Sequence, residues 1–147
     1  MIFIILYILI LAALLAKLEL MIEGKKAGWA MNLPCWKIEN ELINWLLGNK
    51  PLTGYHTWLL LTFLFIFHSP YLFIKFTFQH EVLILGYFCW FWIAEDWFWF
   101  IENNLYGFRN FRPGRIFWHK RWIWFLPVSY VWGILIGTIL LLIGRLK

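Results

Sequence analysis

Apolar residues gather in four long runs along the chain, at about 2–21, 57–75, 82–101 and 122–143. Each run is close to the ~20 residues that a helix needs to cross a hydrocarbon core about 30 Å thick. Since backbone groups in lipid must find their hydrogen bonds within the segment, runs of this kind favour helices. The pattern predicts an all-α integral membrane protein with four transmembrane helices, forming a single transmembrane domain over residues 1–147.

The first polar stretch between these runs contains an amphipathic pattern of its own, at about 35–47. Its apolar positions recur at helical spacing: Ile38, Leu42, Trp45 and Leu46. Pro34 suits the start of a helix, and Gly48 suits its end. We expect a short helix on the cytoplasmic side. It either lies in the membrane interface or packs against the helical bundle.

The composition supports a membrane protein. Of the 147 residues, 63% are hydrophobic and 14% are charged, whereas soluble domains average about 45–50% and about 25%. The first run has no basic residue before it, which favours a retained helix over a cleavable signal peptide. Cys35 and Cys89 lie in different kinds of segment and indicate neither a disulfide framework nor a zinc motif.

Basic residues are distributed unevenly about the predicted spans. Ten lie in or beside the loops after the first and third runs: Lys17, Lys25, Lys26, Lys37, Lys50, Arg109, Arg112, Arg115, Lys120 and Arg121. Three lie on the opposite side: Lys75, Arg145 and Lys147. Because positive charge marks cytoplasmic loops, we expect the plasma (inner) membrane with both termini on the non-cytoplasmic side. The expected partner is the lipid bilayer and not nucleic acid, since no basic face stands clear of the spans.

The third run ends in an unusual stretch, "IAEDWFWFIENN" at 93–104, which sets Glu95, Asp96 and Glu102 among large aromatic residues. On a helix that begins near residue 82, Glu95 would lie about 20 Å from the outer end. Ionisable side chains at such depth usually face a bundle interior or a wet cavity and mark a site.

Each predicted span brings a titratable residue to one layer near the cytoplasmic face. Glu23 shares a helix face with Glu19 at the end of the first run. The candidate metal ligands of this layer are Glu23, His56, Glu95, Asp96, Glu102 and His119. Carboxylates and imidazoles are typical ligands of iron, manganese and zinc, so a metal site is one hypothesis. The alternative is that the acids form salt bridges with Lys17 or with arginines of the third loop, without chemistry.

Established metal and nucleotide motifs are missing from the sequence. A ferritin-type centre needs Glu-x-x-His, but Phe98 stands three residues after Glu95. There is no His-Glu-x-x-His motif, no phosphate-binding glycine loop and no Gly-x-Ser-x-Gly turn. The sequence therefore indicates no known family and leaves open whether the protein is an enzyme.

The third loop contains "RPGR", where Pro113 and Gly114 predict a tight turn. Arg109, Arg112 and Arg115 surround this turn and are candidates for binding lipid phosphate groups, because arginine offers a fork of donors. A merely positive cytoplasmic loop explains them equally well.

Gly133 and Gly137 form a Gly-x-x-x-Gly motif in the last run. Small residues at this spacing let helices approach closely, so the motif could contact another span, another membrane subunit or a second copy in a homo-oligomer.

Three classes of function remain after these observations. The first is a small membrane protein whose Glu/Asp/His cluster binds metal. The second is an accessory or scaffold subunit of a membrane complex. The third is a small transporter that uses its intramembrane carboxylates. The outer half of the predicted bundle is nearly bare except for His68, His80 and Glu81, which counts against a transporter.

Overall fold

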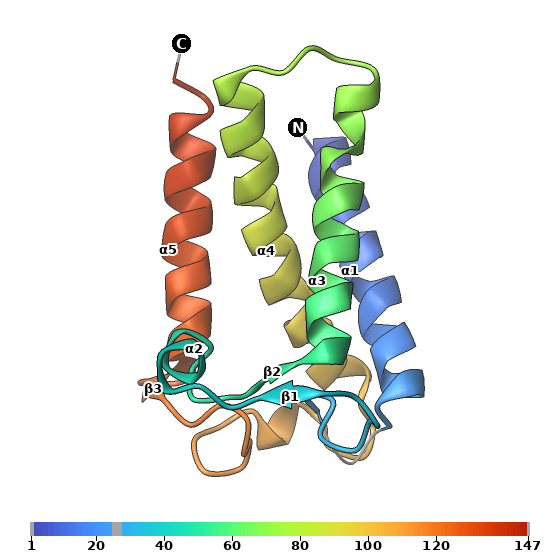
Figure 1. Ribbon diagram of the computed structural model, residues 1–147, viewed down its shortest axis with the longest axis vertical. Coiled ribbons are helices and arrows are strands. Elements are labelled where there is room, and N and C mark those ends of the chain that lie inside the picture. Colours follow the sequence, from blue (N-terminus) through green and yellow to red (C-terminus); the bar gives the residue numbers. More distant parts are fainter. Residues whose placement is uncertain (1, 25–27, 147) are drawn as a thin grey trace.

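The computed structural model describes residues 2–24 and 28–146. Its long helices run side by side: α1 (Ile2–Ile22), α3 (Gly54–His68), α4 (Phe78–Glu102) and α5 (Val128–Ile143) (Figure 1). Both termini lie at one end of this arrangement, and most of the connecting segments gather at the other. Lys25 and Lys26, which contribute to the predicted orientation, lie outside the described residues.

Short elements close the end opposite to the termini. The strands β1 (Lys37–Ile38) and β2 (Leu52–Thr53) pair antiparallel, and so do β3 (Trp122–Ile123) and β4 (Leu126–Pro127). Between β1 and β2 lies the short helix α2 (Glu41–Leu46). The single-turn 3₁₀ helix η2 (Phe108–Asn110) belongs to the same end, whereas η1 (Ser69–Leu72) follows α3 at the end where the termini lie (Figure 1).

The prediction of four transmembrane helices is wrong. Each apolar run contains a helix, but among the described residues only α1 is both long and apolar enough to cross a membrane. With 15 and 16 residues, α3 and α5 are short for a ~30 Å core. Residues 122–127 form the β3–β4 hairpin and do not extend α5. Although α4 has 25 residues, its tryptophans and acids lower its hydropathy.

The predicted helix at 35–47 is also shorter than expected. The helix α2 begins only at Glu41, because residues 37 and 38 pair as strand β1. Asn40 caps it, its side-chain oxygen accepting from the backbone N–H groups of Leu42 (3.0 Å) and Ile43 (3.2 Å). Gly48 follows its end at φ +76°, as the sequence predicts.

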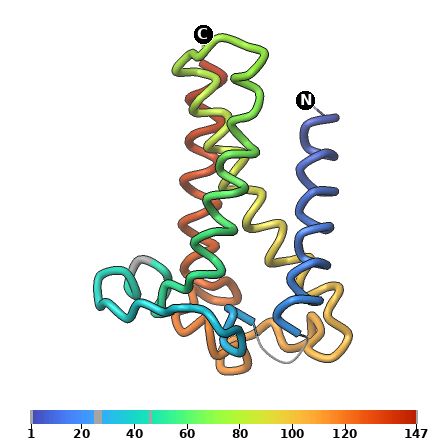
Figure 2. Tube along the Cα trace, turned by 45° about the vertical axis from the view of Figure 1, so that its right-hand side comes forward, coloured from blue at the N-terminus to red at the C-terminus, as the bar shows by residue number. Residues whose placement is uncertain are grey.

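The helix α4 is the centre of the packing. Figure 2 shows it running obliquely between α5 and α1. One buried apolar cluster, near the loop end, comprises Ala16, Leu20, Trp99, Phe100, Ile116 and Trp118. A second, nearer the termini, comprises Ile8, Ala12, Leu15, Phe63 and Phe91. Together they clamp α1 against α4.

Glycines bring α5 close to α4. A Cβ atom at Gly137 would lie 2.9 Å from Cys89 Cβ and 3.3 Å from the carbonyl oxygen of Gly86, and one at Gly133 would lie 3.0 Å from Ile93 Cδ1. The Gly-x-x-x-Gly motif therefore serves the intramolecular contact, one of the predicted alternatives, and this face is covered by α4.

Replacing Gly137 should test this contact. We expect Gly137→Val to destabilise the fold by about 1–3 kcal/mol, because the new side chain overpacks the α4–α5 contact. The exposed neighbour Ile136 supplies the control, Ile136→Val, which should change stability little. Unfolding followed by circular dichroism measures both. Equal stability of the two variants would contradict the close approach.

Candidate metal centre

A cavity of about 350 Å³ lies among the C-terminal end of α1, the first turns of α3 and α5, and the middle of α4. Its polar lining side chains include four acids and their neighbours: Glu19, Glu23, Lys50, His56, Glu95, Asp96, His119 and Tyr130. Five of the six predicted ligands thus line one cavity. The sixth, Glu102, does not: its carboxylate pairs with Lys17 at 3.5 Å.

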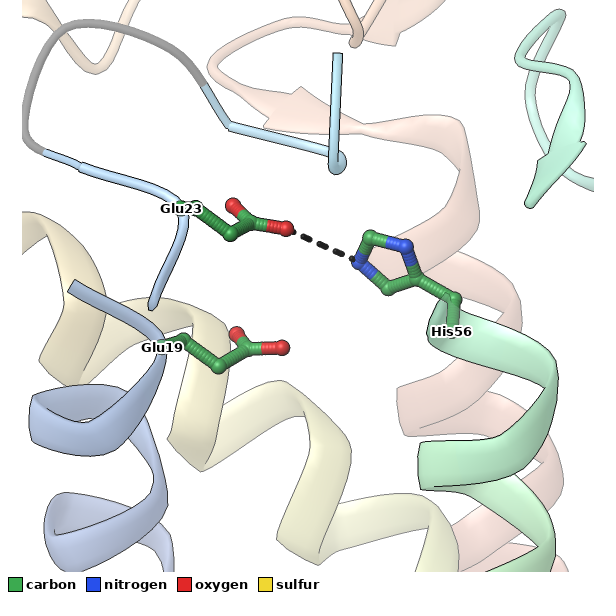
Figure 3. Close-up of side chains that lie close together, drawn as sticks. All are labelled: Glu19, Glu23 and His56. Atoms are coloured by element: carbon green, nitrogen blue, oxygen red, sulfur yellow. Dashed lines mark ion pairs between the residues drawn. The ribbon is translucent and has the colours of Figure 1, made fainter. Parts of the chain in front are cut away.

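Three of these side chains converge most closely. Glu19, Glu23 and His56 each offer one ligand atom within 4.8 Å of the other two. Figure 3 shows both carboxylates extending from the end of α1 toward the imidazole at the start of α3. The distance of 3.7 Å between His56 Nε2 and Glu23 Oε1 is too long for a hydrogen bond. It is close to the separation of about 3.4 Å between two ligands of a tetrahedral zinc ion.

The backbone after α1 positions the Glu23 carboxylate. The Glu23 N–H donates to the Glu19 carbonyl at 2.7 Å, which continues the helical turn. The Ala30 N–H donates to Glu23 Oε1 at 2.6 Å. Trp29 and Ala30 have φ of +60° and +49°, a left-handed conformation that costs roughly 1–3 kcal/mol for each such residue. The chain therefore accepts local strain where it holds this carboxylate.

Thr53 positions His56. Its hydroxyl caps α3 by accepting from the His56 N–H at 3.2 Å, and it lies 2.8 Å from His56 Nδ1. When Nδ1 donates this bond, the lone pair of Nε2 faces Glu23. Trp29 stacks on the imidazole with ring centroids 4.0 Å apart. A hydrogen bond to one ring nitrogen that orients the other is typical of histidine metal ligands.

Burial dominates the electrostatics of the cavity. Desolvation, with repulsion from Glu19, raises the pKa of Glu23 to about 8. Desolvation lowers the pKa of Lys50 to about 8, although several acids oppose this shift, and lowers that of His56 to about 3. Lys50 is the one lysine or arginine among the described lining residues. It also lies 3.5 Å from the centre of the Trp29 ring.

Two carboxylate oxygens in the cavity lack a donor. Among the described residues, no N–H or O–H group donates to Oε1 of Glu19 or of Glu95, and these residues are only 6% and 4% exposed. The two carboxyl groups also approach each other within interaction distance. Buried like charges at close range require a shared proton or a bound cation. The cavity can therefore take up positive charge, as a proton or as a cation.

Asp96 has partners of its own. Its Oδ2 lies 3.2 Å from His119 Nε2 and accepts a hydrogen bond from the Tyr130 hydroxyl. Burial lowers the pKa of His119, while Asp96 partly offsets this effect. These two predicted ligands thus pair with each other. Neither Glu95 nor Asp96 forms an ion pair with an arginine in the described part of the chain, so the predicted arginine salt bridges are not formed there.

The arginines of the third loop lie outside the cavity. Arg109, Arg112 and Arg115 are all exposed. The predicted tight turn is present, since the Arg115 N–H donates to the Arg112 carbonyl at 3.2 Å and Gly114 has φ +77°. Lipid phosphate binding by these arginines stays a prediction.

The polar residues at the opposite end of the molecule do not form a second centre. His68 Nε2 lies 3.1 Å from Glu81 Oε1, and Tyr71 donates to the other oxygen of the same carboxylate. His80 approaches the Lys75 carbonyl instead. The two histidines therefore do not share a ligand position.

The structure adds participants that the spacing of residues did not single out. Lys50 did not differ from the other loop lysines in the sequence, and no sequence pattern singled out Trp29. Tyr130 lay within an apolar run. Thr53 did carry a signal, because a threonine shortly before an apolar helical run is a typical helix N-cap.

No family model, curated protein or solved structure matches this chain. What the site does must therefore be inferred from its own geometry.

The raised pKa of Glu23 predicts a pH-dependent stability in the presence of chelator. Because this pKa is about 8 in the folded chain and near 4.5 in the unfolded chain, the contribution is full below pH 4.5. It is lost as the pH rises to about 8. We expect the thermal midpoint of the wild type to fall across this window, and Glu23→Gln to flatten the fall.

The exposed Glu41 supplies the control, since Glu41→Gln should keep the wild-type slope. Lys50 contributes in a different pH range, because its pKa is lowered from 10.5 to about 8. Its contribution to stability is full above pH 10.5 and is lost as the pH falls to about 8. A wild-type midpoint that stays constant between pH 4.5 and 8 would contradict the assignment to Glu23.

Proposed function

We propose that this protein binds one divalent transition-metal ion, of iron, manganese or zinc, between Glu19, Glu23 and His56. The observation that carries the proposal is the convergence of three ligand atoms within 4.8 Å, from residues that are buried or nearly so. Three protein ligands leave one coordination position open, as in catalytic zinc sites. The open position would face the cavity.

The charge of the cavity supports the same proposal. Four carboxyl groups line the cavity, whereas Lys50 is the one lysine or arginine among its described lining residues. A divalent ion would offset the charges of Glu19 and Glu23 and would engage the Glu19 oxygen that lacks a donor. Neutralising buried carboxylates with a cation is strongly favourable, because an uncompensated charge is costly in a poorly solvated site.

We further propose that α1 anchors the protein in a membrane, with the metal site near the cytoplasmic end of this helix. The basic residues Lys17, Lys25 and Lys26 stand at that end in the sequence, which favours the cytoplasmic side. Ile10, Leu14 and Met21 of α1 are 60%, 64% and 79% exposed, as lipid contact would require. The expected plasma (inner) membrane belongs to this proposal. The placement of both termini outside does not, because it depended on four spans.

Metal content tests the site. The protein is purified in mild detergent without chelator, and bound metal is measured by mass spectrometry. We expect about one ion per chain in the wild type and a loss of most of it in His56→Ala, because the imidazole fixes the ion between the two carboxylates. The matched control is His80→Ala, whose exposed histidine lies outside the cavity and should leave metal content unchanged.

A second pair of variants, at two glutamates, repeats the comparison. Glu23→Gln should lose metal and Glu102→Gln should retain it, since Glu102 pairs with Lys17 outside the cavity. Circular dichroism establishes that each variant is folded. A metal-free wild type, or equal metal content in all four variants, would overturn the proposal.

A further inference from the structure

The cavity changes character with distance from the proposed metal ligands. Its lining residues farther along the helices are mostly apolar: Leu60, Phe88, Cys89, Trp92, Ile93 and Gly133. We name this apolar part of the cavity the shaft. Polar side chains do not alternate with these residues but occupy the other end.

The helix geometry gives the shaft a direction. Leu60 lies one turn beyond His56 on α3, about 6 Å farther along the helix axis. On α4, which runs the opposite way, Phe88 lies seven residues before Glu95, a rise of about 10 Å. Gly133 on α5 lies one turn beyond Ser129. Three helices thus pass from polar to apolar lining in the same direction.

The size of the cavity and the chemistry of the shaft restrict what the cavity can hold. A cavity of about 350 Å³ is at the lower end of the usual range for small-molecule sites, about 300–1,000 Å³. A polar molecule would leave its hydrogen-bonding groups unpaired against Phe88, Ile93 and Leu60, which is costly. An alkyl chain would instead bury apolar surface there.

The polar end of the cavity suits a ligand whose head group carries oxygen. The indole N–H group of Trp99, a lining residue beside the acids, has no acceptor among the described residues, and neither has that of Trp92 in the shaft. The metal position proposed between Glu19, Glu23 and His56 also lacks a fourth ligand from the described chain. A ligand oxygen could fill this position.

We infer that the cavity binds a single-chain amphiphile, with an oxygen-bearing head at the metal and its alkyl chain in the shaft. This inference rests on the proposed metal site and adds the class of ligand. The chain runs from the metal toward Phe88.

A chelating probe of two lengths tests the inference. The protein is loaded with Co²⁺, and its visible spectrum is titrated with acetohydroxamic acid or with decanohydroxamic acid in one detergent. Both probes offer the same head. We expect half-saturation at a concentration at least about tenfold lower for the long probe, because its chain enters the apolar shaft.

Two neighbouring residues of α3 supply matched variants. Leu60 lines the shaft and Leu61 does not, yet the two are 45% and 46% exposed. Leu60→Trp should fill the shaft and abolish the advantage of the long probe, while acetohydroxamic acid still binds. Leu61→Trp should keep the advantage, which also controls for partition of the probe into detergent.

The native cysteines give a readout that needs no variant. Cys89 lines the shaft, whereas Cys35 does not line this cavity. Bound decanohydroxamic acid should slow maleimide labelling of Cys89 several-fold and leave Cys35 unchanged. Peptide mass spectrometry measures the two rates.

The outcomes separate the two proposals. If Co²⁺ does not bind, the metal site itself fails. If Co²⁺ and acetohydroxamic acid bind but the long chain neither improves affinity nor protects Cys89, the metal site stands and the amphiphile inference is overturned.

Discussion

The burial of carboxyl groups in one cavity is the constraint on which the rest of the structure depends. Glu19, Glu23 and Glu95 are buried in it, and Asp96 is half-buried. They come from the C-terminal end of α1 and from α4, which two apolar clusters hold together. Isolated buried charges are among the most expensive features a fold can contain. The neighbours of these acids therefore have to supply protons, donors or cations. Lys50, also buried, supplies part of this compensation.

The segment between α1 and α3 is organised around the same need. The Ala30 N–H turns toward Glu23, and this requires left-handed backbone at two successive residues other than glycine. Thr53 caps α3 and orients the His56 ring with one hydroxyl. Strain of this kind persists where surrounding contacts enforce it and is concentrated at functional sites.

Asp96 illustrates the other outcome open to an acid in this cavity. His119 and Tyr130 both reach its Oδ2 atom, so this carboxylate has partners within the chain, whereas Glu19 and Glu95 each have an oxygen without a donor. Residues of one chemical type, on neighbouring turns and in one cavity, thus divide into satisfied and unsatisfied groups.

Apolar runs in the sequence predict the approximate positions of the four long helices. The places of acids and histidines at the ends of these runs predict which residues gather near one end. Among the described helices, the sequence pattern overestimated α3, α4 and α5 as membrane spans. The apolar run before α5 includes residues 122–127, which pair as a hairpin, and α3 already ends at His68. Which acids meet which partners was decided only by the tertiary structure. Helical spacing fixes the face of a residue on its own helix, but the crossing of α4 over α1 decides that Glu95 approaches Glu19 and that Glu102 reaches Lys17.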